Sequence, residues 1–201
     1  MKDQFNIVVA GVGGQGALLA SRVLAMAAIK EGKQTITGEI HGLAQRGGAI
    51  AAHVRIGKGA HGCIIPLCGA DVVLGMEFME ALRYAEFMSP DCTTVMSTSK
   101  TVPPIVWTLD NLEYPEEEEV LKRVASFTKD LYLVDSDDLA VKAGNALAAN
   151  SAVLGALAGA TKLPFSKDSV LEALKETVPK KALDANIKAF NMGAEEFRKY
   201  G

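Results

Sequence analysis

The 201-residue chain is 49% hydrophobic but only 6% aromatic, which predicts a core built from Ala, Val, Leu and Ile side chains. Its net charge of −3 and the lack of a basic block argue against a nucleic-acid partner. No apolar run is long enough to span a bilayer and no signal peptide is visible, so we expect no membrane contact. The 3 cysteines favour reduced thiols over a disulfide framework, so we expect a cytoplasmic protein.

The first predicted element is a buried strand over residues 7–10 that leads into a cluster of glycines. Gly11, Gly13 and Gly16 in GVGGQG have the G-x-G-x-x-G spacing of a dinucleotide-binding turn. Glycine allows the backbone to turn tightly and lets a phosphate or another backbone approach closely. The N–H groups and the dipole of the next helix, predicted over residues 15–30, favour an anion at the same point. A turn that serves only close packing is the alternative.

The second predicted strand, residues 34–39, follows at the short spacing of a βαβ unit, whose crossover is almost always right-handed. A dinucleotide site needs an acidic residue near the end of this strand to bind a ribose hydroxyl. The acid present, Glu39, lies 23 residues beyond Gly16, and the strand that contains it leads directly into HGLAQRGG. Ordinary NAD binding is therefore disfavoured, and a stand-alone NAD(P)- or nucleotide-binding Rossmann protein is kept as the alternative.

The stretch HGLAQRGG, residues 41–48, has neither helical nor strand periodicity. Arg46 offers a planar fork suited to a carboxylate or a phosphate, and Gly47 and Gly48 allow a ligand or another chain to approach the backbone. Polar, glycine-interrupted loops between regular elements often carry binding groups. We therefore predict a binding loop here, against the alternative of a solvent loop with a hydrated Arg46.

Residues 49–56 alternate between apolar and mixed positions, which predicts a half-covered strand. His53 and Arg55 share its second face, and either proximity to Arg46 or a solvated or partner-facing surface explains them. The three cysteines lack the number and spacing of an iron–sulfur or zinc site, and no histidine pair has metal-ligand spacing. We expect buried thiols and no metal.

The rest of the chain continues to alternate strands with helices. The predicted strands are 70–76, 92–96, 105–109 and 131–134. The predicted helices are 77–88, 143–160, 167–177 with Ser166 as its cap, and 185–200. Two more helices are predicted, one that begins at 116 and buries Val120, Leu121 and Val124, and one capped by Asp137 and Asp138. Helix 143–160 is rich in small residues, which favours tight packing or a subunit interface. This order predicts an α/β fold with a Rossmann-like doubly wound, mostly parallel sheet in one domain, residues 1–201, with 164–201 as a helical C-terminal tail.

No catalytic constellation is present. The chain has no GxSxG motif, no Cys–His pair at suggestive spacing and no lysine after the glycines of the kind that P-loops carry. The residue types alone therefore indicate a binding domain with an anion-accepting turn and no catalytic residues.

GVGGQG together with EIHGLAQRGG and HVRIG resembles the gamma-type subunits of 2-oxoacid:ferredoxin (acceptor) oxidoreductases. The HGLAQRGG variant is most similar to the small, beta subunits of indolepyruvate ferredoxin oxidoreductases. The likeness continues through ADVVLGMEFMEALR, GNALAANSAVLGALAG and NIKAFNMG, and so covers nearly the whole chain.

The resemblance implies an accessory subunit of an enzyme that oxidatively decarboxylates arylpyruvates such as indolepyruvate to acyl-CoA and CO2. Thiamine diphosphate and iron–sulfur clusters are then expected on a large partner subunit, with ferredoxin as electron acceptor, and the isolated chain is expected to be inactive. Coenzyme A is the ligand that this chain would help to hold. The residues that the resemblance places near the partner or the cofactor are Gly11, Gly13, Gly14, Gln15, Gly16, His41, Gln45, Arg46, Gly47 and Gly48.

Overall fold

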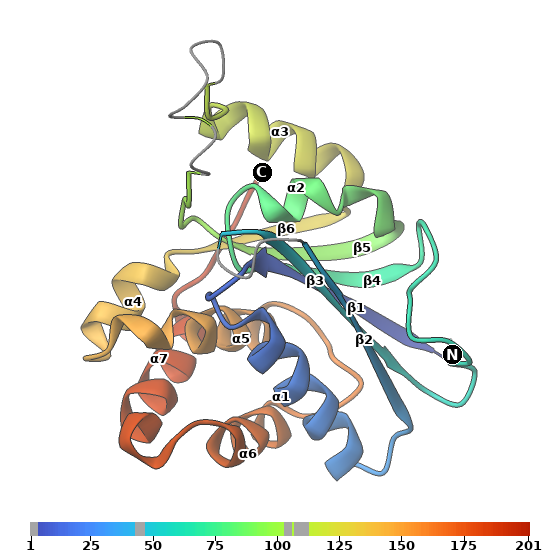
Figure 1. Ribbon diagram of the computed structural model, residues 1–201, viewed down its shortest axis with the longest axis vertical. Helices are drawn as coiled ribbons and strands as arrows, with labels where there is room; N and C mark the ends of the chain where they lie inside the picture. The colour runs from blue at the N-terminus through green and yellow to red at the C-terminus, as the bar shows by residue number, and fades with distance from the viewer. Residues whose placement is uncertain (1–3, 43–46, 103–105, 107–112) are drawn as a thin grey trace.

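The computed structural model describes residues 4–42, 47–102, 106 and 113–201, and these form a seven-stranded sheet with helices on both faces (Figure 1). The strands are β1 (Phe5–Val12), β2 (Thr35–His41), β3 (Ala49–Ile56), β4 (Ala70–Gly75), β5 (Met88–Ser97), β6 (Asp130–Val134) and β7 (Arg198–Lys199), in the order β2-β3-β1-β4-β5-β6-β7. The pairs β1–β4, β4–β5 and β5–β6 are parallel, whereas β3 and β7 run antiparallel to their neighbours. The predicted doubly wound, mostly parallel α/β sheet is confirmed.

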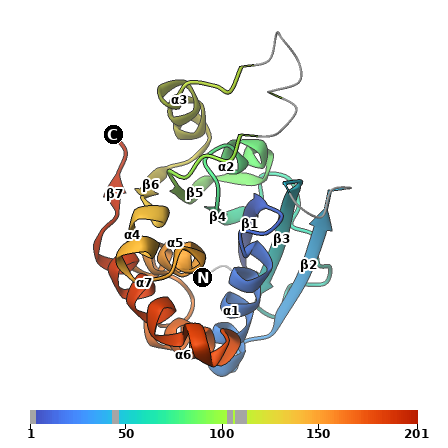
Figure 2. The same cartoon turned by 60° about the vertical axis from the view of Figure 1, so that its left-hand side comes forward.

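The helices divide between the two faces of the sheet. One face carries α1 (Ala17–Lys30), α4 (Ser136–Lys142), α5 (Ala149–Ala160), α6 (Lys167–Thr177) and α7 (Leu183–Glu195), and the other carries α2 (Glu80–Arg83) and α3 (Glu117–Phe127) (Figure 1). Short 3-10 turns lie at Ala85–Phe87, Ala146–Ala148 and Lys180–Ala182. Figure 2 shows β2 and β7 at opposite edges of the sheet. Among the described residues, no helix has the length and apolarity needed to cross a membrane.

The alternation of side chains along β1 supplies both hydrophobic cores. Ile7 and Val9 belong to the cluster under α1, α5, α6 and α7, while Val8 belongs to the cluster under α2 and α3. Successive side chains of a strand point to opposite faces, so a strand covered on both faces reads as a continuous apolar run. This explains why the opening run is apolar without alternation.

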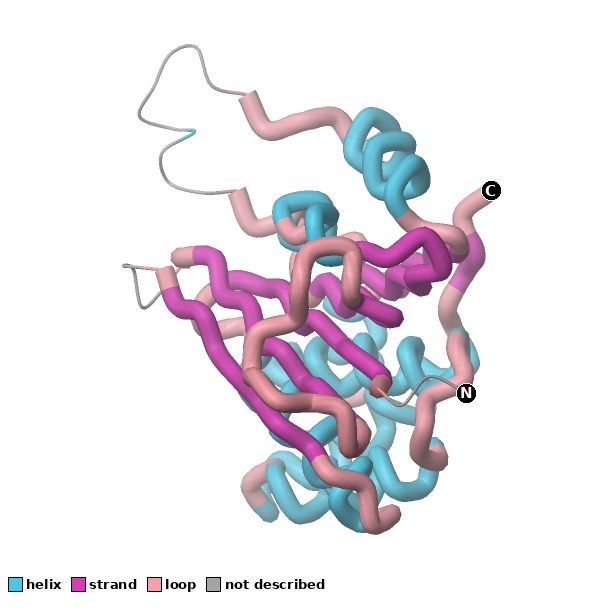
Figure 3. Tube along the Cα trace, turned by 90° about the vertical axis from the view of Figure 1, so that its right-hand side faces the viewer, coloured by secondary structure: helices cyan, strands magenta, loops and turns pink. Residues whose placement is uncertain are grey.

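The strand predicted after α1 does form, and the structure adds its place in the sheet: β3 lies between β2 and β1, so β2 occupies the edge. The predicted half-covered face of β3 is wrong, because His53 is fully buried and Arg55 is buried as well. The loop of residues 57–69, which joins β3 to β4, covers this face and lies in front of the strands in Figure 3.

Arg55 holds the covering loop through its guanidinium group. It donates to the carbonyl oxygens of Gly62 at 2.8 Å and Ile64 at 3.2 Å, and to the side-chain oxygens of Gln4 and Asn6 at 2.9 and 3.2 Å. These four bonds satisfy a charge that would otherwise be costly to bury. Sequence alternation alone gave no sign of a loop that returns over the strand.

The cysteines are only partly as expected. Cys92 is buried, and burial raises its pKa to about 11, which keeps the thiol protonated. Cys63 and Cys68 are exposed on the covering loop, so the prediction of buried thiols is wrong for these two. The predicted strand 105–109 lies outside the described residues except for Val106.

Helix boundaries differ from prediction at three places. Residues 77–88 form only α2 and a 3-10 turn, because Met88 already begins β5. Helix 143–160 is interrupted before α5, where Gly144 adopts a φ of 96° and the Asn145 side chain caps the next turn. The final helix ends at Glu195, because the chain then pairs with the free edge of β6 as β7. The cap of α4 is Asp135, which accepts from the backbone N–H of Asp138 at 3.2 Å.

The small residues of α5 serve close packing within the chain. A side chain at Gly155 or Gly193 would collide with the main chain of α7 or α5, respectively, at the Phe190 and Ala152 carbonyls. Helix backbones therefore approach to a separation at which only glycine fits. Tight packing, one of the two predicted roles for this helix, is confirmed.

Candidate functional site

The glycine turn joins the carboxyl end of β1 to the first turn of α1. Gly14 and Gly16 have positive φ values of 104° and 81°, a conformation that side chains rarely adopt. Gly16 is the N-cap of α1, and it provides no side-chain cap, while the first turn of the helix contains no acid. The first N–H groups of a helix lack partners within it, so this turn presents unpaired donors at the positive end of the helix dipole.

The second glycine loop is attached to the first by main-chain hydrogen bonds. The N–H of Gly13 donates to the Gly48 carbonyl at 2.9 Å, and the N–H of Gly47 donates to the Gly13 carbonyl at 3.3 Å. We call this pair of bonds the glycine clasp. It joins Gly13 to Gly47 and Gly48, which lie more than thirty positions further along the sequence. The two motifs singled out from the sequence are therefore parts of one structure.

Gln15 fixes the turn through both ends of its amide. Its Oε1 accepts from the N–H of Val12 at 3.0 Å, and its Nε2 donates to the Thr101 hydroxyl at 3.0 Å. Gly11 has a packing role, since an added Cβ would lie 3.0 Å from the Cβ of Met76. The crevice at the carboxyl ends of β1 and β4, where the flanking helices lie on opposite faces, is the position at which open α/β sheets bind ligands.

His41 is not part of the clasp. It ends the edge strand β2, is exposed, and lies 3.1 Å from the Glu39 carboxylate. Both His41 and Gly11 pair with Ile50 of β3, so the two lie two strand spacings apart, about 10 Å. Glu39 is thus separated from the glycine turn by β3, and it is not placed as the ribose-binding acid of an NAD site. Gln45 and Arg46 lie outside the described residues.

Two cavities flank the segment that follows β4. The first, which we call the turn cavity, has a volume of about 410 Å³ and is lined by Gly14, Gln15, Gly16, Met76, Ser99, Ser136, Asp137, Ala146, Leu147, Ala149 and Asn150. The second, which we call the acidic cavity, has a volume of about 420 Å³ and is lined in part by Val12, Gly47, Glu77, Glu80 and Tyr114. The bond from Gln15 to Thr101 joins a residue of the first to a residue of the second.

Glu77 organises the wall between the two cavities, and sequence reasoning missed it. Its buried carboxylate accepts from the N–H groups of Met79 at 2.6 Å and Glu80 at 3.2 Å, and from the N–H of Thr101 at 2.9 Å and the Tyr114 hydroxyl at 2.7 Å. The sequence did contain a signal for this residue, because Glu77 is an acid that directly follows a predicted buried strand. Burial, and then the hydrogen bond to the Glu77 carboxylate, raise the pKa of Tyr114, which keeps its hydroxyl a donor.

Glu80 lies beside Glu77 and is also buried. Its Oε1 accepts from Arg83 Nε at 3.0 Å, but its Oε2 has no hydrogen-bond partner among the described residues. Burial is the main cause of the raised pKa of this carboxyl, and the neighbouring Glu77 adds to the shift, while Arg83 opposes it. The acidic cavity therefore contains one well-bonded carboxylate and one carboxyl that resists ionisation.

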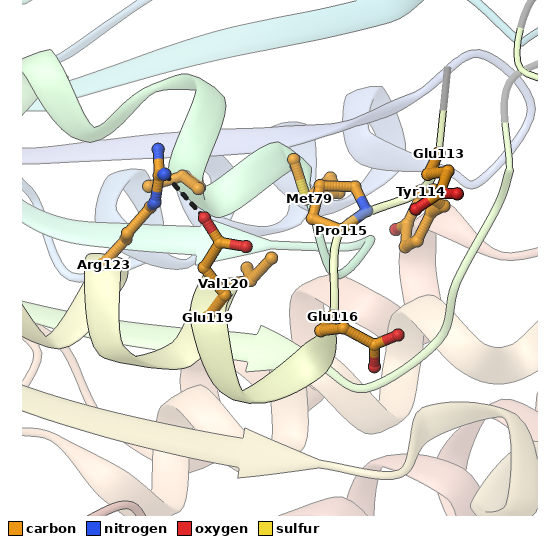
Figure 4. A pocket seen from close by; sticks show the side chains of 9 residues that line it. Met79, Glu113, Tyr114, Pro115, Glu116, Glu119, Val120 and Arg123 are labelled. Carbon is orange, nitrogen blue, oxygen red and sulfur yellow. Dashed lines mark hydrogen bonds and ion pairs between the residues drawn. The ribbon is translucent and has the colours of Figure 1, made fainter. Parts of the chain in front are cut away.

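A third cavity, of about 370 Å³, lies between α2 and α3. Figure 4 shows the ion pair of Glu119 with Arg123 at one end and Glu113 and Tyr114 at the other. The acids of the first turn of α3 pair with exposed cations, including Glu118 with Lys122 at 2.7 Å, and so form a solvated face. Within the described part of the chain, no group of three or more His, Cys, Asp or Glu residues is placed to hold a metal ion.

Comparisons with known proteins identify the family of the chain. The family model for pyruvate ferredoxin/flavodoxin oxidoreductase matches residues 6–196. The indolepyruvate oxidoreductase subunit IorB of Archaeoglobus fulgidus is 43% identical over 190 residues, covering 94% of each chain. The pyruvate/ketoisovalerate oxidoreductases common subunit gamma of Pyrococcus abyssi is 30% identical over 181 residues, covering 89% of each chain.

Solved structures give the same result. The pyruvate oxidoreductase subunit PORC of Thermotoga maritima has a TM-score of 0.68 at 27% identity, covering 100% of both chains. The 2-oxoglutarate:ferredoxin oxidoreductase of Magnetococcus marinus shares the fold, with a TM-score of 0.72 at 19% identity, and there the likeness covers 97% of this chain but 32% of the other. From the family model and these relatives, the chain belongs to the pyruvate ferredoxin/flavodoxin oxidoreductase family.

Proposed function

We propose that this chain is the small, accessory subunit of a 2-oxoacid:ferredoxin oxidoreductase that converts arylpyruvates such as indolepyruvate to acyl-CoA and CO2. The observation that carries the proposal is the 43% identity, over 94% of both chains, to a protein named as an indolepyruvate oxidoreductase subunit. The large partner subunit would carry thiamine diphosphate and the iron–sulfur clusters and would reduce ferredoxin. The free thiols support a cytoplasmic location.

The residues of this chain do not themselves suit the redox cofactors. Cys92 is buried with its thiol protonated, while Cys63 and Cys68 lie on the covering loop, and an iron–sulfur cluster requires a set of cysteine thiolates. Coenzyme A is different, because its phosphates suit the unpaired N–H groups at the start of α1. The glycine turn and the HGLAQRGG loop would contribute to coenzyme A binding, to the contact with the large subunit, or to both.

Purification from the native cell extract tests the assignment. A tagged chain should retain a stoichiometric large subunit with iron–sulfur absorbance, and the complex should reduce ferredoxin when given indolepyruvate and coenzyme A. Assays over a panel of 2-oxoacids would define the preferred substrate. A chain that stays alone in its own extract would contradict the proposal, and measurable NAD(H) affinity of the isolated chain would support a nucleotide-binding protein instead.

Substitution in the binding loop gives a second test. We expect Arg46→Ala to weaken coenzyme A use or subunit assembly, because a guanidinium fork is suited to bind a phosphate or a carboxylate. The melting temperature should be nearly unchanged. Full activity and full assembly of the Arg46→Ala complex would reject this role.

A further inference from the structure

We propose that the acidic cavity receives one long cationic side chain, a lysine or an arginine, of the large partner subunit, and that Glu80 binds the charged end of this side chain. The inference rests on the proposed function, which supplies the large subunit. It goes further in naming a point of contact between the two subunits and the type of residue that fits it.

The unsatisfied carboxyl of Glu80 points to an occupant of the cavity. Glu80 is 4% exposed and lines the cavity, and its Oε2 has no hydrogen-bond partner among the residues that the structure describes. Its other oxygen accepts from Arg83 Nε at 3.0 Å. The last torsion of a glutamate side chain has a broad minimum, so a small rotation turns Oε2 toward the cavity. A buried acceptor without a donor is costly, and a donor that enters the cavity removes this cost.

The neighbouring groups indicate that the missing donor is an N–H cation. Each oxygen of Glu77 already accepts two hydrogen bonds, so Glu80 provides the open oxygen of this pair of acids. The Tyr114 hydroxyl donates to Glu77 at 2.7 Å, and a phenol oxygen that donates its proton can still accept. Within the described ranges, these acids do not form a metal-binding group. An ammonium or guanidinium group, which has several N–H donors, suits both acceptors.

The lining of the cavity selects a cation on a long aliphatic stem. Acids outnumber bases among the charged residues of the lining, which are Glu77, Glu80, Glu113 and Arg83. The apolar part of the wall consists of Val12, Ala49, Met79, Val106 and Pro115. Lysine and arginine pack their aliphatic stems against apolar surface and carry the charge at the tip. Their side chains therefore match both parts of the wall.

The cavity adjoins the two glycine loops, which the proposed function assigns in part to the contact with the large subunit. Gly47, a member of the glycine clasp, belongs to the lining. Gln15 of the glycine turn donates to the hydroxyl of Thr101, another lining residue, at 3.0 Å. A partner chain that covers these loops therefore passes beside the cavity.

Occupation of the cavity should be linked to the protonation of Glu80. Burial is the main cause of the raised pKa of this carboxyl, Arg83 opposes the shift, and Glu77 adds to it. The other titratable groups around Glu80 are Tyr84, Glu113 and Tyr114. A bound cation favours the ionised carboxyl, so association releases a proton wherever the free chain holds Glu80 protonated. The affinity for the large subunit should therefore weaken as pH falls through the raised pKa.

The test measures the dissociation constant of the complex that copurifies with the tagged chain, by mass photometry over a dilution series at several pH values. Glu80→Gln removes the carboxyl from the cavity and keeps its shape. Glu86→Gln is the matched control, because it removes an acid from an exposed position in the 3-10 turn that follows α2. Arg83→Gln separates a direct role of Glu80 from one that acts through Arg83. Glu80→Asp keeps the charge but shortens its reach, and it keeps the test valid if Glu80→Gln fails to fold.

We expect Glu80→Gln to raise the dissociation constant by about ten- to hundredfold, which corresponds to the loss of one hydrogen bond between charged groups. Glu80→Asp should give a smaller increase. Glu80→Gln should also lose the pH dependence of the affinity that the native complex shows near the raised pKa. The Glu86→Gln complex should match the native one, and Arg83→Gln should keep the pH dependence.

Three outcomes would contradict the proposals, and they are distinguishable. Native affinity and native pH dependence in Glu80→Gln, or equal losses in Glu80→Gln and Arg83→Gln, would overturn the cation site alone. Coupling between Glu80→Gln and Arg46→Ala in urea denaturation of the isolated chain would also overturn it, because the cation would then belong to this chain. A native chain that copurifies with no large subunit would overturn the proposed function itself.

Discussion

Replacement of Glu77 by Gln should destabilise the fold far more than the same change at Glu80. The Glu77 carboxylate is 1% exposed and accepts four hydrogen bonds, two at each oxygen. The glutamine amide keeps an oxygen at one of the two carboxylate positions but places an NH2 group at the other. The two donors at that second position then lose their acceptor. Each hydrogen bond to a charged group contributes roughly 1.5–3 kcal/mol, so the loss of two predicts a decrease of about 3–6 kcal/mol in the free energy of unfolding.

Glu80→Gln is the matched control, because the two carboxyls are buried three positions apart. Glu80 accepts one side-chain bond, from Arg83, and because half of the Arg83 side chain is exposed, solvent screens the pair and its contribution is set at roughly 0–1 kcal/mol. Burial raises the pKa of Glu80, so its folded form binds the proton more tightly than the unfolded form. The stability from this group is present at low pH and is lost as pH rises through the raised pKa. The Gln variant should therefore gain on the native chain as pH increases.

Urea denaturation monitored by circular dichroism, with native-state hydrogen exchange, measures both changes. Either the amide of Met79 or that of Thr101 should lose protection in Glu77→Gln, because the two donate to opposite oxygens of the carboxylate and only one of these oxygens is replaced. Equal destabilisation by the two substitutions, or a loss below about 1 kcal/mol for Glu77→Gln, would refute the reasoning, since one charged hydrogen bond already exceeds that value.

Three further changes test other parts of the fold. Burial, with a smaller effect of Arg55, lowers the pKa of His53 from its ordinary value of 6.5. The free energy of unfolding should therefore fall as the pH drops below 6.5. Urea denaturation at a series of pH values should show a weaker dependence of this free energy on pH in His53→Gln than in the native chain. Thermal melting should show that Gly193→Ala lowers the free energy of unfolding by at least about 3 kcal/mol, because its Cβ would collide with α5. Gly32→Ala is the control and should lose about 1 kcal/mol, since Gly32 has open space around it but a positive φ. Equal losses would contradict the close helix contact. Deletion of residues 196–201 should expose the edge of β6 and promote association, measured by light scattering; a monodisperse variant would contradict this.

The class of fold and the glycine motifs were predictable from the sequence because they depend on local patterns. Val120, Leu121 and Val124 recur at helical spacing, and they are the buried face of α3. Ser166 caps α6 as predicted, by accepting from the N–H of Ser169 at 3.1 Å. Such features require only neighbours in the chain.

The parts that were missed depend on contacts between distant segments. The position of β3 between β2 and β1, and the burial of His53 under the loop 57–69, follow from tertiary packing that alternation does not encode. The final helix was predicted too long because the free edge of β6 was not visible in the sequence. Asn150 lies well beyond the glycine motifs in the chain, so only the fold brings its amide to Gly16.

The glycine clasp joins the two motifs through main-chain atoms alone. Side-chain substitution at Gly13 or Gly48 therefore leaves its donors and acceptors in place, and alanine scanning of the loops would not detect it directly. Proline at position 13 is different, since it removes the N–H that donates to the Gly48 carbonyl. The side chains on this surface can accordingly change while the hydrogen-bonded connection between the two loops is kept.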